Sequence, residues 1–167
     1  MEIRTTESFL KYYENIRRRT LRVIECIPPD RIEWTHHEGK YTFGDLVRHL
    51  AATERYMFAE NVQGNPSRYP GHGRDLADGY DAIMAYMRDR HAEAIEIFGG
   101  LDQAALDRKC TTPAGIAMTT WKWLRAMVEH EIHHRARVYL MLGMLGVATP
   151  PLYGLTEEEV KERSSPA

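Results

Sequence analysis

The stretch that decides the fold is TWKWLRAMVEHEIHHRARVYLMLGML, residues 120 to 145. His130 and His134 lie four residues apart in it and share one face, because each α-helical residue turns by about 100°. Apolar side chains recur along that face at three- and four-residue steps, as in an amphipathic helix: Trp123, Met127, Val138, Met141 and Leu145. The sequence therefore predicts a long helix, ending at Gly146, whose apolar face carries two imidazoles.

Three further segments show helical periodicity and end at proline or glycine. The second of them begins with a capping box, in which Thr42 caps the helix and Asp45 stands three residues on. The predicted ranges are about 7–27, 42–64 and 78–100. Four helices of similar length with modest connections predict an all-α fold, an antiparallel four-helix bundle.

The remaining segments are short. Residues 101–118 break the helical pattern, and the turn around Pro113 and Gly115 predicts a small hairpin. A second capping box, Thr156 with Glu159, predicts a short C-terminal helix, followed by a frayed tail at about 161–167. We expect a single domain over residues 1–167, because the composition does not change along the chain.

Composition excludes several classes of protein. With 22 Lys and Arg against 24 Asp and Glu, the formal charge is −2 and the basic residues are scattered, which argues against nucleic acid as a partner. No apolar run approaches the roughly 18 residues of a membrane span, and the first residues lack a signal-peptide core, so we expect a cytoplasmic protein. Cys26 and Cys110 are interpreted as reduced thiols.

The histidine pair on the predicted fourth helix has two interpretations. A divalent metal would satisfy two imidazoles that face the bundle interior. Alternatively, one is a core histidine bonded to a carbonyl and the other lies at the surface. His49, beside Leu46 and Leu50 on the second helix, is the candidate third ligand. His133 is expected in solvent or beside the site, and His36, His37, His72 and His91 are expected at the surface.

Two motifs and the chain ending resemble the DinB/YfiT-like family. The second helix carries FGDLVRHL at residues 43–50, the fourth carries HEIHHR at 130–135, and the ending is PPLYGLT at 150–156. The resemblance implies that His49, His130 and His134 bind a divalent metal, for which imidazoles suit zinc, nickel and iron alike. Many members follow the last histidine with Arg-Gly-Gln, whereas this chain has Arg135-Ala136-Arg137, so Arg137 either binds an anionic substrate or extends to solvent.

Three protein ligands leave a coordination position open, which is typical of catalytic rather than structural sites. The resemblance implies a metal-dependent enzyme with a small-molecule substrate, either a hydrolase or an S-transferase using a low-molecular-weight thiol such as bacillithiol or mycothiol. The alternative is a non-enzymatic bundle that binds or sequesters a metal or small molecule under stress. Candidates for a general base or substrate contact are Glu54, Glu60, Glu131 and Arg137, with Glu60 nearest the His49 face in helical projection.

The resemblance also implies a homodimer, since relatives commonly associate through bundle faces. Tyr12, Tyr80 and Tyr86 offer aromatic area for such an interface.

Overall fold

The first two long helices begin at residues whose side chains cap them. The computed structural model describes residues 3–164, in which Thr5 caps α1 (Thr6–Ile24) by accepting a hydrogen bond from the Ser8 amide. The capping box of Thr42 and Asp45 opens α2 (Phe43–Thr53), as expected. The other two long helices are α4 (Tyr80–Gly99) and α6 (Thr120–Met144). All four predicted helices are therefore confirmed, each within a few residues of its expected ends.

The second predicted helix is interrupted by a wider turn. After α2 the chain forms one π-helical turn, η2 (Glu54–Phe58), and then continues as α3 (Ala59–Val62). The Ala59 amide bonds to the carbonyl of Glu54, five residues earlier, which admits one extra residue. The side chains of α3 are therefore rotated about the helix axis relative to their positions in a regular α-helix. A prediction that assumes 3.6 residues per turn throughout places these side chains on the wrong face.

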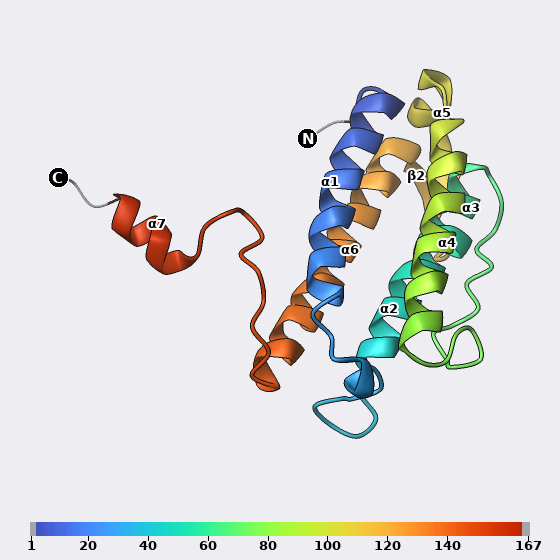
Figure 1. The fold of residues 1–167 in the computed structure, drawn as a ribbon. Helices are drawn as coiled ribbons and strands as arrows, with labels where there is room; N and C mark the ends of the chain where they lie inside the picture. The colour runs from blue at the N-terminus through green and yellow to red at the C-terminus, as the bar shows by residue number, and fades with distance from the viewer. Residues whose placement is uncertain (1–2, 165–167) are drawn as a thin grey trace.

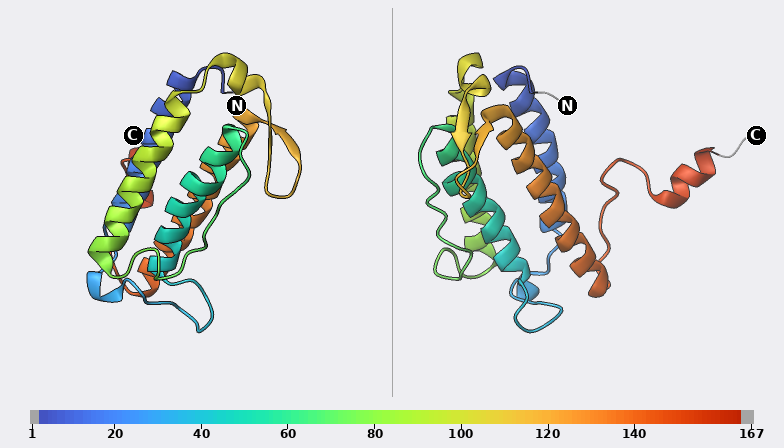
Figure 2. Two further views of the ribbon diagram at one scale, coloured as in Figure 1. Left: turned by 90° about the vertical axis from the view of Figure 1, so that its right-hand side faces the viewer. Right: turned by 180° about the vertical axis from the view of Figure 1, so that it is seen from behind.

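Two apolar clusters at opposite ends of the bundle fix the direction of each helix. One joins the end of α1 and the end of α6 to the beginnings of α2 and α4, and includes Ile24, Phe43, Leu46, Ile83, Met87 and Val138. The other joins the beginnings of α1 and α6 to the ends of α3 and α4, and includes Phe9, Ile16, Val62, Phe98, Leu124 and Val128. Thus α1 and α6 run parallel, α2 and α4 run parallel, and the two pairs are antiparallel to each other (Figures 1 and 2).

This order of directions follows from one long connection. Residues 63–79 carry the chain from the end of α3 back along the bundle to the start of α4 (Figure 1). Consequently α1 packs against α4 and α6, and α2 packs against the same two helices. The predicted four-helix bundle is confirmed, with directions that do not simply alternate along the chain.

The connection into α6 contains the predicted hairpin. Strands β1 (Lys109–Thr111) and β2 (Ala117–Thr119) pair antiparallel, with Cys110 opposite Met118. Two short elements were not predicted: the 3-10 turn η1 (Pro29–Arg31) and helix α5 (Gln103–Asp107), which Asp102 caps. Cys26 and Cys110 are both free thiols, as expected.

The C-terminal segment leaves the bundle. Helix α7 (Glu157–Ser164) has no buried residue and projects away from the four long helices (Figure 1). The predicted short C-terminal helix is therefore present and includes residues 161–164, while the rest of the tail expected to fray lies outside the described residues. None of the helices in residues 3–164 has the length and apolar character needed to cross a membrane.

Candidate metal centre

His49, His130 and His134 converge between α2 and α6. Each offers one ring nitrogen, and the three nitrogens lie within 4.8 Å of one another. Nε2 of His49 is 3.1 Å from Nε2 of His130, and the ring centroids of His130 and His134 are 4.4 Å apart. Within residues 3–164, no fourth His, Cys, Asp or Glu joins this group. The three residues that the sequence singled out thus form one cluster with the donor set of a three-histidine metal site.

A divalent ion fits two features of this cluster. Nδ1 of His134 is buried and has no hydrogen-bond partner within the described part of the chain. The facing Nε2 atoms of His49 and His130 can bond to each other only if one of the two carries a proton. A divalent ion that binds one nitrogen of each ring would accept both Nε2 lone pairs and remove the need for that proton.

The loop between α3 and α4 supplies a hydrogen-bonded chain behind His49. The Tyr69 hydroxyl lies 2.8 Å from Nδ1 of His49 and 3.1 Å from Nδ1 of His72. If His49 donates through Nδ1 to Tyr69, and Tyr69 donates onward to His72, then Nε2 of His49 keeps its lone pair for a metal. This is the outer arrangement that fixes the tautomer and orientation of a ligating imidazole.

Arg48 attaches that loop to α2. Its fully buried guanidinium donates to the carbonyl oxygens of His72 and Ala77, at 2.8 and 3.0 Å, and pairs with Glu33 and Asp45 at 2.7 Å each. Because Arg48 precedes His49 directly, the same turn of α2 carries a metal-ligand candidate and the anchor of the loop that orients it. A Cβ on neighbouring Gly44 would lie 2.7 Å from Oε1 of Glu33, so the pairing also requires glycine there.

Burial keeps the three imidazoles neutral. It lowers the pKa of His49 to about 4, with further lowering from the charges of His130, His72 and Arg137. It lowers the pKa of His130 to about 4, and that of His134 to about 3. All three rings are therefore unprotonated at pH 7, the state in which a histidine binds a metal.

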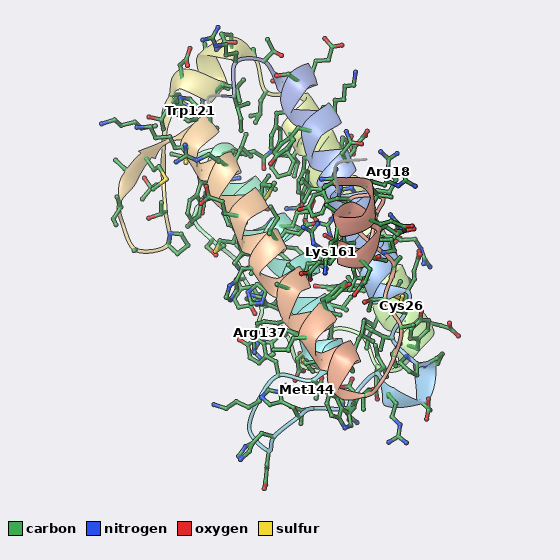
Figure 3. All side chains as sticks on the ribbon, turned by 90° about the vertical axis from the view of Figure 1, so that its left-hand side faces the viewer. Arg18, Cys26, Trp121, Arg137, Met144 and Lys161 are labelled. Carbon is green, nitrogen blue, oxygen red and sulfur yellow. The ribbon has the colours of Figure 1, made fainter. Side chains whose placement is uncertain are left out.

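Aromatic side chains and one cation surround the histidines. Phe58 packs between Trp123 and His130, with ring-centroid distances of 4.5 and 5.9 Å. The Arg137 guanidinium carbon lies 5.1 Å from the centroid of Tyr41, whose ring is 5.8 Å from His49. Arg137 therefore stays beside the cluster, on the side of α6 away from α7 (Figure 3). His133 is exposed and stacks edge-on to His134 at 5.0 Å, which confirms its expected place beside the site.

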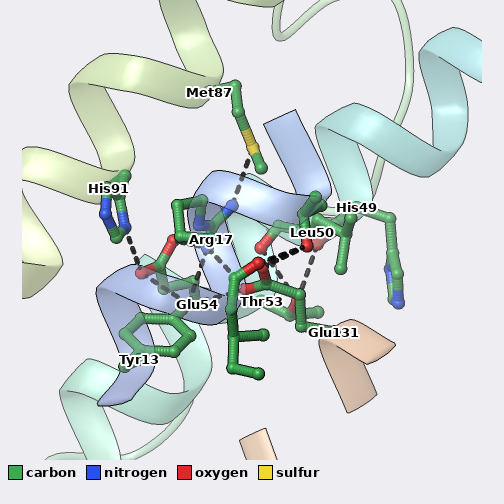
Figure 4. A network of polar contacts seen from close by, with 11 residues as sticks. Tyr13, Arg17, His49, Leu50, Thr53, Glu54, Met87, His91 and Glu131 are labelled. Atoms are coloured by element: carbon green, nitrogen blue, oxygen red, sulfur yellow. Dashed lines mark hydrogen bonds and ion pairs between the residues drawn. The ribbon is translucent and has the colours of Figure 1, made fainter. Parts of the chain in front are cut away.

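A buried polar layer separates the two apolar clusters. The Tyr13 hydroxyl lies 2.8 Å from Glu54 and 3.0 Å from Glu131, and Arg17 pairs with both carboxylates (Figure 4). Thr20 donates to Glu131 at 2.6 Å, and His91 contacts Glu54 at 2.7 Å. Burial opposes ionisation of Glu54, but Arg17 and His91 outweigh it and hold its pKa below the ordinary value. The layer joins α1, η2, α4 and α6 through satisfied charges.

The layer also fixes the rotation of the helices that carry the histidines. Glu131 points into it from between His130 and His134, so α6 cannot turn without breaking these contacts. His49 points away from the layer, while Thr53, one turn on, donates to the His49 carbonyl at 2.7 Å (Figure 4). Glu54 and Glu131 are therefore parts of the bundle interior, and neither belongs to the ligand cluster.

Glu60 lies in a separate ion cluster. Its Oε1 accepts from Arg55 at 2.6 Å and also from Arg68, and its Oε2 accepts from Asn65 at 3.1 Å. The helical projection that placed Glu60 next to His49 assumed a regular helix, and the extra residue in η2 turns this part of the chain. Both oxygens of the carboxylate are engaged in holding the start of the 63–79 loop.

Two histidines expected at the surface were misplaced. His72 packs on Tyr41 with ring centroids 4.4 Å apart, and His91 reaches the polar layer. His91 stands four residues after Met87 and seven before Phe98, so the periodicity of α4 already placed it on the buried face. Tyr69 and His72 lie in a loop, where no periodicity points to them. His36 and His37 are exposed, as expected.

Comparison with known proteins assigns the chain to a family. Residues 12–138 match the family model of the DinB superfamily. The chain belongs to the DinB superfamily. This confirms the resemblance seen in the two histidine motifs.

Individual members of the superfamily are distant in sequence. Uncharacterized protein YjoA of Bacillus subtilis is 22% identical over 151 residues, which cover 89% of this chain and 96% of YjoA. The crystal structure of YjoA superposes with a TM-score of 0.69 at 20% identity, covering 87% of this chain and 96% of that one.

Two other solved structures share the fold. A DinB-like protein from Bacillus cereus gives a TM-score of 0.71 at 16% identity, covering 89% of this chain and 97% of its own. YfiT from Bacillus subtilis, described as a probable metal-dependent hydrolase with an unusual four-helix bundle topology, gives 0.64 at 15% identity, with coverages of 86% and 89%. At these identities the structures support the bundle topology alone.

Proposed function

We propose that this DinB-superfamily chain is a divalent-metal-dependent enzyme, and that hydrolysis of a small-molecule substrate is its activity. One observation carries the proposal: three neutral imidazoles converge within 4.8 Å, and within residues 3–164 no fourth side-chain ligand completes the set. An ion held in this way supplies a Lewis acid with a position open to water. The description of YfiT as a probable metal-dependent hydrolase agrees with this chemistry.

The surrounding residues have separate tasks in this proposal. Tyr69 and His72 orient His49, and the polar layer around Glu131 holds His130 and His134 toward α2. Phe58 and Trp123 cover one side of the cluster with apolar rings and limit the access of bulk water there. Arg137 offers a cation at the edge of the cluster, where it would orient an anionic group of the substrate.

Thiol S-transfer is the second candidate, and Arg137 is the observation that favours it. A guanidinium close enough to lower the pKa of both His49 and His134 would also stabilise a thiolate at the open position. A low-molecular-weight thiol would then be the co-substrate. The imidazole donors suit zinc, nickel and iron, and metal analysis of protein from its native host identifies the ion.

Cobalt substitution separates these functions. If a thiol is the co-substrate, its addition to the cobalt-loaded protein produces a sulfur-to-metal charge-transfer band, and this band is absent in His49→Ala. If the protein is a hydrolase, no such band forms, ester or amide substrates turn over, and kcat/KM rises with a single ionisation near about pH 7. A protein that binds the ion but shows neither result is a sequestration protein, and the enzyme proposal fails.

A further inference from the structure

The guanidinium of Arg135 is buried and has no direct partner among the described residues. Its side chain is only 3% exposed, and its Nη1 has no hydrogen-bond partner. No ion pair or hydrogen bond of this guanidinium is found within residues 3–164. The other two buried arginines form ion pairs: Arg17 with two carboxylates, and Arg48 with two carboxylates and also with two carbonyls. Since an unpaired buried charge is costly, Arg135 would be stabilised by an anion that residues 3–164 do not provide.

Arg135 lines a cavity between α6 and the C-terminal segment. The cavity has a volume of about 560 Å3, within the range of small-molecule sites. Helix α6 contributes one wall, with apolar area from Ile132, Ala136 and Tyr139. Residues 149–158 contribute the other wall, with apolar area from Leu152, Tyr153 and Leu155. One cation, Arg135, surrounded by apolar side chains is the lining expected of a site for an organic anion.

Two arginines of α1 hold the outer wall in place. The guanidinium carbon of Arg19 lies 4.9 Å from the centroid of the Tyr153 ring, and Arg22 donates to the carbonyl of Pro151 at 3.4 Å. The segment after α6 is thereby tied across to α1 before it reaches α7. Most of the cavity wall therefore comes from α6 and residues 149–156, and only Glu157 and Glu158 come from α7.

The cavity is distinct from the histidine cluster. Arg135 and Arg137 differ by two residues, which turns their side chains about 200° apart around α6. None of the three clustered histidines, His49, His130 and His134, is among the residues that line the cavity. A ligand beside Arg135 would therefore occupy a second site.

Two acidic residues at the cavity limit the negative charge that a ligand can carry. Glu157 and Glu158, in the first turn of α7, also line the cavity, and neither pairs with Arg135. Their carboxylates would repel a second negative charge, while Arg135 can bind one carboxylate through two parallel N–H donors. We propose that this pocket binds a small organic monocarboxylate, with the carboxylate on Arg135 and an apolar body against Tyr139, Leu152 and Tyr153.

Benzoate titration of the full chain by calorimetry tests this proposal. Benzoate should bind saturably, acetate at least 10-fold more weakly because it lacks the apolar body, and phthalate more weakly than benzoate because of its second charge. Arg135→Gln should weaken benzoate at least 10-fold. Arg137→Gln, two residues away, and His49→Ala, at the metal centre, should leave benzoate affinity within about 2-fold.

A second variant, Tyr153→Ala, tests the same pocket in case Arg135→Gln does not fold. Tyr153 is 76% exposed, so Tyr153→Ala should keep the fold, weaken benzoate several-fold and leave acetate binding unchanged. The proposal is overturned if the wild-type chain shows no saturable benzoate binding, or if Arg135→Gln folds and binds benzoate like wild type. It is equally overturned if Arg137→Gln or His49→Ala abolishes binding, because benzoate then sits at the metal centre.

Discussion

Nδ1 of His49 lies 2.8 Å from the hydroxyl of Tyr69, a residue of the loop that returns the chain from α3 to α4. This contact joins a helix of the bundle to an irregular segment 20 residues further on. It gives Tyr69 control over which nitrogen of His49 is free to bind a metal. The long loop is therefore part of the metal centre as well as a connection.

Replacing Tyr69 tests this relationship. Tyr69→Phe keeps the ring and removes the hydroxyl that bridges His49 and His72, so metal affinity should fall about 10- to 100-fold. Competition with a chelator of known affinity measures the change. Tyr56→Phe, which removes a hydroxyl that contacts Arg90, is the matched control and should not alter metal affinity. Equal affinities for Tyr69→Phe and wild type would exclude the orienting role.

The depressed histidine pKa values predict acid lability of the metal-free protein. Between about pH 6.5 and 4, the unfolded chain binds protons on these imidazoles that the folded chain does not, so stability falls as the pH falls through this window. Each imidazole contributes at most about 1.4 kcal/mol per pH unit. The free energy of unfolding, measured in denaturant at several pH values, gives the slope.

One variant isolates the contribution of a single ring. Asn cannot titrate at position 134, so in His134→Asn the slope of the unfolding free energy against pH should be shallower over the same window, by at most the contribution of one proton. Identical slopes for His134→Asn and wild type would show that His134 is not held neutral by burial.

Much of the bundle and of the histidine cluster could be predicted from the sequence, because both depend on regular helical periodicity. The spacing of His130 and His134 on an apolar face placed both rings correctly, and the capping box at Thr42 placed the start of α2. His91 was also accessible to the same reasoning. These positions follow from local chain geometry, which repeats every few residues.

The rest depends on contacts that no local pattern encodes. The π-turn at Glu54–Phe58 rotates the following residues about the helix axis. Glu60 therefore lies in an ion cluster with Arg55 and Arg68. Tyr69 and His72 reach the site because Arg48 binds the loop backbone. The parallel pairing of α2 and α4 follows from the path of residues 63–79 along the bundle. Each of these features is set by tertiary structure.

The buried polar layer predicts a large effect at Arg17. Arg17→Met leaves the carboxylates of Glu54 and Glu131 buried without their cation, and should destabilise the fold by about 3 to 5 kcal/mol. Glu131→Gln keeps the pair of Arg17 with Glu54 and should cost less, about 1 to 2 kcal/mol. Arg18→Met, at the exposed neighbouring position, should be nearly neutral. Urea unfolding compares the three, and equal losses for Arg17→Met and Arg18→Met would contradict the role of the layer.

A homodimer remains a proposal, and the structure shifts its expected face. Tyr80 and Tyr86 pack partly against the chain's own core, whereas Leu140 and Met144, one turn apart on α6, are 61% and 54% exposed. Light scattering should give twice the mass of one chain, and Leu140→Asp should reduce it to the monomer value. Ile116→Asp, on the hairpin turn, should stay dimeric. A monomer mass for the wild-type chain at micromolar concentration would remove the proposal.

Metal content of purified variants tests the central claim most directly. After dialysis against trace zinc, elemental analysis should find one ion per chain in the wild type and in His133→Ala. It should find almost none in His49→Ala, His130→Ala and His134→Ala, each of which lacks one of the three converging nitrogens. Full metal content in any of those three variants, or equal loss in His133→Ala, would contradict the assignment of His49, His130 and His134 as the metal ligands.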